Sequence, residues 1–359
     1  MRRLVACLIL FMFSTLSIAS IGVNVVGYEL PENKKFIILI DEGHNQIFSA
    51  KDFLEGFYLV NETLPIEVYE LHEPIDSKVL SGVDLLIIPP KSSGSTYKTD
   101  EVEAISKFIE RGGSLLVLGT TNTSADMGLL NLLLEQIEIN DEPIGDYIQF
   151  LLVKGSPIKL YDDLSNPSKI ESLLSINVSM WSGEASNVFS EVNGTILIES
   201  AALNVLEYND FIILNASETS YGLDQDGELY FANSTPAIGA LKTYGEFSRV
   251  AVLGFTEPLT NRTSPLGDKW INLGANKEFF KSLITWLLRP QAFKVENIQR
   301  PTELYLYLIA LAIILLPIAY VVNLYERKIE KKKEKKKEEI RVSEILAKIR
   351  EEGKKKNKK

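Results

Sequence analysis

The sequence predicts an α/β fold: an open, mostly parallel sheet flanked by helices, with a β-rich insertion and one C-terminal transmembrane helix. Short apolar runs at 35–40, 84–88 and 115–118 have the composition of buried strands. An amphipathic helical pattern at 99–111 separates two of these runs. Strands that are apolar on both faces and alternate with helices are typical of a parallel sheet covered on both sides. A stretch without charged residues, 304–322, predicts the membrane span.

The first strand, 35–40, is followed by a polar turn at 41–46. Ser49 is expected to cap a short helix. Its buried face is expected to consist of four residues, Phe53, Leu54, Phe57 and Tyr58. A second strand is expected at 66–69 and a third at 84–88, which Pro89 and Pro90 end.

The clearest helix pattern begins at Thr99, which we expect to be its cap. Asp100 and Glu101 lie in its first turn, where the helix dipole favours acidic side chains. Gly112 and Gly113 end the pattern, and the buried strand at 115–118 follows.

Shorter alternating runs fill residues 144–247 and predict a β-rich insertion with antiparallel strands. A strand at 249–254 and a helix at 276–288 then restore the α/β pattern. We therefore expect one exported domain at 21–290, followed by a linker at 291–303.

The two ends of the chain predict a single-pass membrane protein. Residues 1–20 combine two arginines, an apolar stretch and small residues, which is the layout of a secretory signal peptide; an uncleaved anchor helix is the alternative. Residues 304–322 would form a helix of about 28 Å, enough to cross the hydrocarbon core. The lysine-rich tail at 323–359 predicts a cytoplasmic C-terminus and an exported domain outside the cell membrane. Cys7, the only cysteine, falls in the signal segment, so no disulfide is expected.

Charge divides the chain in the same way. The tail from Glu326 onward holds 16 basic and 8 acidic residues. Without the tail and the two N-terminal arginines, 38 − 16 − 2 = 20 basic and 48 − 8 = 40 acidic residues remain, so the exported part carries a net charge of about −20. Such a domain is not expected to bind nucleic acid.

The tail suggests two partners. Its lysines next to the span are expected to contact anionic membrane lipid. A helix with one short apolar stripe cannot fold alone, so it either docks on a protein partner in a membrane complex or stays disordered. The residues of the stripe are Val342, Ile345, Leu346 and Ile349.

Seven Asn-x-Ser/Thr sequons are candidate glycosylation sites, and all lie in the region expected outside the cytoplasm. They are Asn61, Asn122, Asn177, Asn193, Asn215, Asn233 and Asn261.

The segments 40–46, 85–89, 105–119 and 249–257 together resemble the class I glutamine amidotransferase-like superfamily in its degenerate GIFT form. The resemblance spans about 34–289. Similar domains occur in uncharacterised membrane-anchored prokaryotic surface proteins, in intraflagellar-transport proteins and in the non-catalytic membrane subunit of oligosaccharyltransferase. It implies an architecture more than an activity.

Catalytic members of that superfamily resemble one another in a cysteine at a strand-to-helix turn and in a later histidine. Here the turn after Leu118 contains Thr120 and Thr121, and both histidines, His44 and His72, precede it. A threonine without an adjacent base is a poor nucleophile. Chemistry of the amidotransferase type is therefore excluded.

Polar residues expected at the carboxyl edge of the sheet are candidates for ligand binding: Asp41, Glu42, His44, Asn45, Ser93, Thr120 and Thr121. If the protein is an enzyme, Asp41, His44 and Glu257 are the candidate catalytic residues. The alternative, which we favour, is that Asp41 and His44 only fix the turn at Gly43. No metal site and no cofactor are expected, because no second histidine lies at a ligand spacing.

Three hypotheses follow. The first is a non-catalytic membrane-anchored scaffold or accessory subunit that binds protein or glycan outside the cytoplasm. The second is an extracytoplasmic hydrolase that uses Asp41, His44 and Glu257. The third is a ligand-sensing ectodomain that signals through the tail.

Overall fold

A computed structural model describes residues 35–288, except 95, 163, 165–171, 182, 207–210, 233–234 and 246, together with 324–325, 327–333 and 335–337. The chain divides into two units, Met1–Gln291 and Ala292–Lys359. The described residues of the second unit are helical and exposed. Among the described residues, no helix is both long and apolar enough to cross a membrane. The expected signal peptide (1–20), linker (291–303) and span (304–322) lie outside them.

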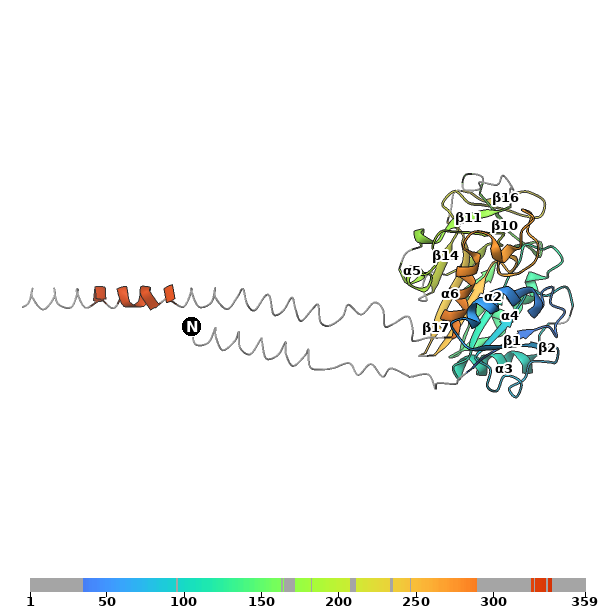
Figure 1. The fold of residues 1–359 in the computed structure, drawn as a ribbon, viewed down its shortest axis with the longest axis horizontal. Coiled ribbons are helices and arrows are strands. Elements are labelled where there is room, and N and C mark those ends of the chain that lie inside the picture. The colour runs from blue at the N-terminus through green and yellow to red at the C-terminus, as the bar shows by residue number, and fades with distance from the viewer. Residues whose placement is uncertain are drawn as a thin grey trace, which may run out of the picture. The chain divides into compact units, whose positions relative to one another are not determined.

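The first unit is built on a nine-stranded sheet (Figure 1). Five neighbouring strands are parallel, in the order β2 (Ile66–Leu71), β1 (Phe36–Asp41), β3 (Leu85–Ile88), β4 (Ser114–Leu118) and β18 (Ser248–Leu253). Antiparallel strands continue the sheet beyond β18: β17 (Ala237–Tyr244), β13 (Leu203–Val205) and β7 (Ile148–Phe150), with β14 (Ile212–Asn215) also paired to β17. The predicted α/β class with a large, mostly parallel sheet is confirmed.

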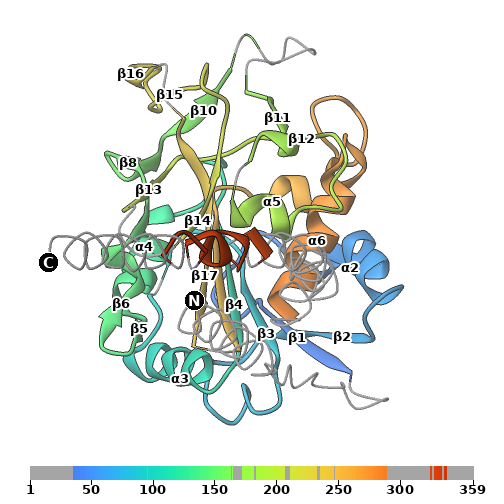
Figure 2. The same cartoon turned by 90° about the vertical axis from the view of Figure 1, so that its left-hand side faces the viewer.

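Helices cover both faces of the sheet (Figure 2). On one face, α3 (Thr99–Glu110) and α4 (Met127–Gln136) pack in the same apolar cluster as alternate strand residues such as Leu86, Leu115 and Val250. On the other face, α2 (Leu54–Asn61) packs against α6 (Asn276–Leu288), with Phe57 and Phe280 in edge-to-face contact at 5.3 Å between ring centroids. Burial on both faces explains why these strands are continuous apolar runs.

Two local predictions are corrected. After Ser49 the chain first forms a 3-10 turn, Ala50–Phe53, before α2 begins. This places Phe53 and Phe57 in the core but leaves Leu54 and Tyr58 exposed. The cap of α3 is Lys98, whose backbone is extended, and Thr99 is the first helical residue.

The expected β-rich insertion, 144–247, is rich in strands, and part of it continues the main sheet. The strands β7, β13, β14 and β17 extend the main sheet, and the remaining described elements are small sheets, two 3-10 helices and one short α-helix. These are β5 (Glu138–Ile139), β6 (Glu142–Pro143), η2 (Ile144–Asp146), β8 (Leu152–Val153), β9 (Ser156–Pro157), β10 (Lys159–Tyr161), β11 (Leu174–Asn177), η3 (Val178–Met180), α5 (Glu184–Val188), β12 (Thr195–Ile198), β15 (Tyr221–Leu223) and β16 (Leu229–Phe231).

The segment between β18 and α6, which includes η4 (Glu257–Leu259) and η5 (Trp270–Asn272), packs against the turn that follows β1. Arg262 donates from Nε and Nη2 to the carboxylate of Asp52 at 2.9 and 2.7 Å, and its guanidinium lies 4.0 Å from the centre of the Phe48 ring. The backbone N–H of Asn261 also donates to the carbonyl of Asp52. These contacts tie the last part of the domain to the first.

Candidate functional site

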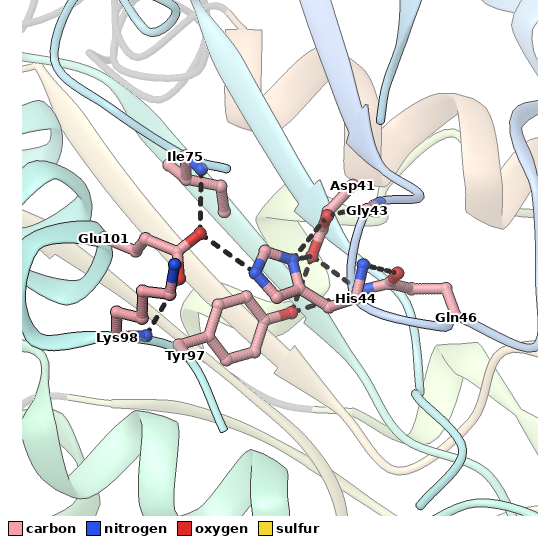
Figure 3. A network of polar contacts seen from close by, with 8 residues as sticks. All are labelled: Asp41, Gly43, His44, Gln46, Ile75, Tyr97, Lys98 and Glu101. Atoms are coloured by element: carbon pink, nitrogen blue, oxygen red, sulfur yellow. Dashed lines mark hydrogen bonds and ion pairs between the residues drawn. The ribbon is translucent and has the colours of Figure 1, made fainter. Parts of the chain in front are cut away.

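The candidate site lies where the strand order reverses. From β1 the chain goes outward to β2 and then crosses to β3 on the other side of β1. The loops that follow the carboxyl ends of β1 and β3 therefore run to opposite sides of the sheet. Open α/β sheets commonly bind ligands between two such loops. In this protein, buried polar side chains occupy that position (Figure 3).

Asp41, the last residue of β1, is fully buried and accepts hydrogen bonds from four groups. The backbone N–H of Gly43 donates at 3.0 Å and the Tyr97 hydroxyl at 2.7 Å. Gln46 Nε2 and His44 Nδ1 donate as well, the latter at 2.9 Å. A carboxylate with this many donors is satisfied without water or ligand.

His44 lies between two carboxylates. Its Nδ1 faces Asp41 and its Nε2 faces Glu101 Oε1 at 3.0 Å (Figure 3). Only 9% of its side chain is exposed, and its ring packs on Tyr97 with 4.2 Å between centroids. Since a neutral imidazole has one N–H, only the protonated ring donates to both carboxylates.

Glu101 joins three segments. It is the third residue of α3, and its Oε2 accepts from the backbone N–H of Lys98, which caps the helix. Its Oε1 accepts both from His44 and, at 2.9 Å, from the backbone N–H of Ile75 in the turn after β2. Glu101 therefore fixes the positions of the helix, the turn at Ile75 and the loop after β1.

Lys91 and Tyr97 complete the cluster from the segment between β3 and α3. Lys91 is 1% exposed, and its ammonium group lies 4.9 Å from the centre of the Tyr97 ring. An ammonium group beside two carboxylates and a histidine is the expected compensation for charges that are buried together.

The electrostatics favour the ionised forms of His44 and Glu101 and the neutral form of the Tyr97 phenol. Burial lowers the pKa of His44, but the hydrogen bond to Asp41 and the charges of Asp41 and Glu101 outweigh it, and the net shift is upward. Burial raises the pKa of Glu101, but hydrogen bonds from Lys98 and Ile75 and the charge of His44 reverse the direction, and the net shift is downward. Burial and the neighbouring charge of Asp41 hold the pKa of the Tyr97 phenol well above its usual value.

Glu257 does not belong to this cluster. It follows β18, which lies three strand spacings, or about 14 Å, from β1 in the sheet. Its carboxylate accepts a hydrogen bond from the hydroxyl of Thr120, which is itself fully buried. Burial raises the pKa of Glu257. The hydroxyl of the neighbouring Thr256 donates to the carbonyl of Gly119 at 2.7 Å, so this second group is also internally satisfied.

The other predicted ligand-binding residues are spread along the edge. The carboxylate of Glu42 accepts from the backbone N–H of Ala50. Asn45 and Ser93 are exposed, and the carbonyl of Asn45 accepts from Ser92. Thr121 is half-buried beside Thr120. The structure thus brings together Asp41 and His44 but neither Ser93 nor Glu257.

Within the described ranges, one group brings three potential metal-ligand atoms within 4.8 Å of one another: Glu42, Glu70 and His72. They come from the ends of two neighbouring strands. Glu42 already binds the Ala50 N–H, and Glu70 and His72 face solvent. We assign no metal to this group.

Of the sequon asparagines, Asn61, Asn122, Asn177 and Asn193 are exposed, while Asn215 and Asn261 are half-buried. Asn233 lies outside the described residues.

Sequence reasoning missed Glu101, Tyr97 and Lys91 as members of the cluster. The available signal was weak: Glu101 occupies the third position of a helix, where an acidic residue is expected for capping alone.

No protein-family model and no curated protein matches this sequence. Among solved structures, the mmIFT52 N-terminal domain is similar at 16% identity and a TM-score of 0.48, covering 73% of this chain and 99% of that one. A ThuA-like protein from Bacteroides uniformis is similar at 12% identity and a TM-score of 0.39, covering 73% and 95%. A ThuA-like protein from Parabacteroides merdae is similar at 9% identity and a TM-score of 0.37, covering 71% and 90%. Because these TM-scores lie below 0.5, no conclusion about this chain rests on them.

Proposed function

We propose that this chain is a non-catalytic, membrane-anchored scaffold or accessory subunit. Its exported domain, a degenerate member of the amidotransferase-like class, binds a protein or glycan outside the cytoplasm. Residues 304–322 anchor it, and the lysine-rich tail contacts anionic lipid and a protein partner on the inner side.

The observation that carries the proposal is the state of His44. Both of its nitrogens face carboxylate oxygens, at 2.9 and 3.0 Å. A general base needs a nitrogen with a free lone pair within hydrogen-bond reach of the substrate. The protonated imidazole has no lone pair to offer, its ring packs on Tyr97, and only 9% of its side chain is exposed.

The position of Glu257 also supports a non-catalytic role. A hydrolase that used Asp41, His44 and Glu257 would need the three side chains in one pocket. The order of the strands separates Glu257 from the other two. The hydroxyl that donates to the Glu257 carboxylate belongs to Thr120, which is fully buried, so a substrate carbonyl has no access to it.

The membrane-anchored part rests on the sequence. The described tail residues add one supporting feature, because they are helical, exposed and strongly basic. Basic residues next to a bilayer surface gain about 1 kcal/mol each from anionic lipid.

The test uses the tagged full-length chain, cross-linked in native membranes and purified, with bound proteins and glycans identified by mass spectrometry. The variants are His44→Gln and Glu257→Gln, with His72→Gln as the matched control because His72 is exposed. Far-UV circular dichroism and thermal unfolding establish which variants are folded.

A scaffold predicts that one partner set, absent from an unrelated single-pass control, is recovered with the wild type and with every folded variant. Cells that depend on the protein should also grow equally well with each folded variant. A folded His44→Gln or Glu257→Gln protein that keeps its partners but loses its cellular function would overturn the proposal in favour of an enzyme.

A further inference from the structure

His44 lies at the meeting point of three separate segments. Asp41 belongs to β1, Glu101 to the first turn of α3, and Tyr97 to the connection between β3 and α3. Through Glu101 the ring is also linked to the turn at Ile75, because the same oxygen accepts from both groups. One side chain therefore links parts of the chain that lie far apart in sequence.

The bridge depends on one proton. The protonated ring donates an N–H to Asp41 and another to Glu101, whereas the neutral ring keeps a single N–H. Asp41 faces Nδ1 with both of its oxygens, at 2.9 and 3.0 Å, and this favours the tautomer that keeps the Nδ1 proton. The lone pair of Nε2 would then face Glu101 Oε1 at 3.0 Å, and the attraction would become a repulsion.

The charged and titratable groups that face His44 come from every element around it. They are Asp41 from β1, Glu101 from α3, and Lys91 and Tyr97 from the segment between β3 and α3. With His44 protonated, one cation faces both Asp41 and Glu101. With His44 neutral, that cation is lost from between the two carboxylates, which is costly in a site of low polarity.

Loss of the proton would affect the two sides unequally. Asp41 keeps its donors Gly43, Gln46 and Tyr97. The hydrogen bond to Glu101 is the one that ties His44 to α3 and to the Ile75 turn, and it is the one that fails. Glu101 can relieve the repulsion by moving away together with the start of α3 and the Ile75 turn.

We propose that the Asp41–His44–Glu101 bridge is a proton-dependent latch that holds the Ile75 turn and the segment at 96–101 against the end of β1, and that opens when His44 loses its proton. This goes beyond the scaffold role and does not depend on it. Because the latch lies at the carboxyl edge of the sheet, its opening changes the shape of the loops there. The shifts already described point the same way, with the pKa of His44 above and that of Glu101 below the ordinary value.

The test is amide hydrogen exchange with mass spectrometry on the full chain in detergent micelles between pH 6 and 9. The labelling time is shortened as the pH rises, because the intrinsic exchange of amides is base-catalysed. In peptides that cover 72–80 and 96–101, protection should fall about tenfold per pH unit between about pH 6.5 and the raised pKa of His44. A peptide that covers 115–118 in β4 should keep its protection, since it lies in the centre of the sheet.

Two histidine variants and one glutamate variant decide the assignment. His72→Gln should behave as the wild type, and His44→Gln should show no pH-dependent fall in protection. In Glu101→Gln the fall in protection should end at a lower pH, because the variant lacks one of the two carboxylates that hold the proton on His44. This variant serves as the test if His44→Gln does not fold. Constant protection of 96–101 in the wild type from pH 6 to 9 would overturn the proposal, as would a fall in protection that neither His44→Gln nor Glu101→Gln changes.

Discussion

Replacing Asp41 with asparagine should destabilise the domain more than any surface change of the same kind. The side chain is fully buried and accepts from Gly43, His44, Gln46 and Tyr97. An asparagine has the same shape, but its NH2 group would face two or more of these donors in either orientation of the amide. Breaking one partner of a buried charge pair costs about 3–5 kcal/mol.

For a domain of this size, 1 kcal/mol corresponds to roughly 2–4 °C in Tm, so the melting temperature should fall by roughly 6–20 °C. The assay is thermal unfolding of the full chain at pH 7, followed by circular dichroism. Asp100→Asn is the control: it makes the same chemical change at an exposed position in the first turn of α3, and it should cost less than about 0.5 kcal/mol. An Asp41→Asn protein that melts within about 2 °C of the wild type would show that the buried network contributes little to stability.

Two further predictions concern pH and backbone packing. The pKa of Glu101 is lowered in the folded state from an ordinary value of 4.5. Its contribution to the free energy of unfolding is therefore present above pH 4.5 and is lost as the pH falls through the folded pKa. The urea midpoint of the wild type should drop between about pH 5 and 3, and that of Glu101→Gln should drop less steeply. Gly254→Ala should cost about 3 kcal/mol or more, because the added Cβ would lie 2.1 Å from the carbonyl oxygen of Ala201. Gly155→Ala, at a φ of +83° with open space around it, should cost only about 1 kcal/mol by the same urea titration, and equal losses for the two glycines would contradict the packing argument.

Elements with a strong repeating pattern were predicted well. The helix expected at 276–288 has the bounds of α6, and its five inward residues are all buried. Phe279, Phe280, Leu283, Ile284 and Leu287 recur at the spacing of one helix face, so the sequence alone places them. The exposure of Tyr58 was not predicted, because the 3-10 turn before α2 shifts which residues face inward.

The candidate site was predictable only where it is local. Asp41 and His44 are three residues apart in one turn, and they are in contact. Glu257 was expected beside them because both follow strands of the same sheet and strand ends share an edge. Which strands are neighbours depends on long-range pairing, and β3 and β4 separate β1 from β18. Glu101 reaches His44 from a different helix, and no local spacing indicates that contact.

The position of β18 has a consequence for how the chain folds. Strands β1 to β4 are complete once the first 118 residues have been made, but β4 finds its second neighbour only when β18 arrives, after residues 119–247 have followed. Until then the apolar edge of β4 is open, and such edges pair readily with other chains. A sheet closed by partners so distant in sequence has a high contact order and forms slowly. Protection of that edge by a chaperone would therefore matter more for this protein than for one whose strands pair in chain order.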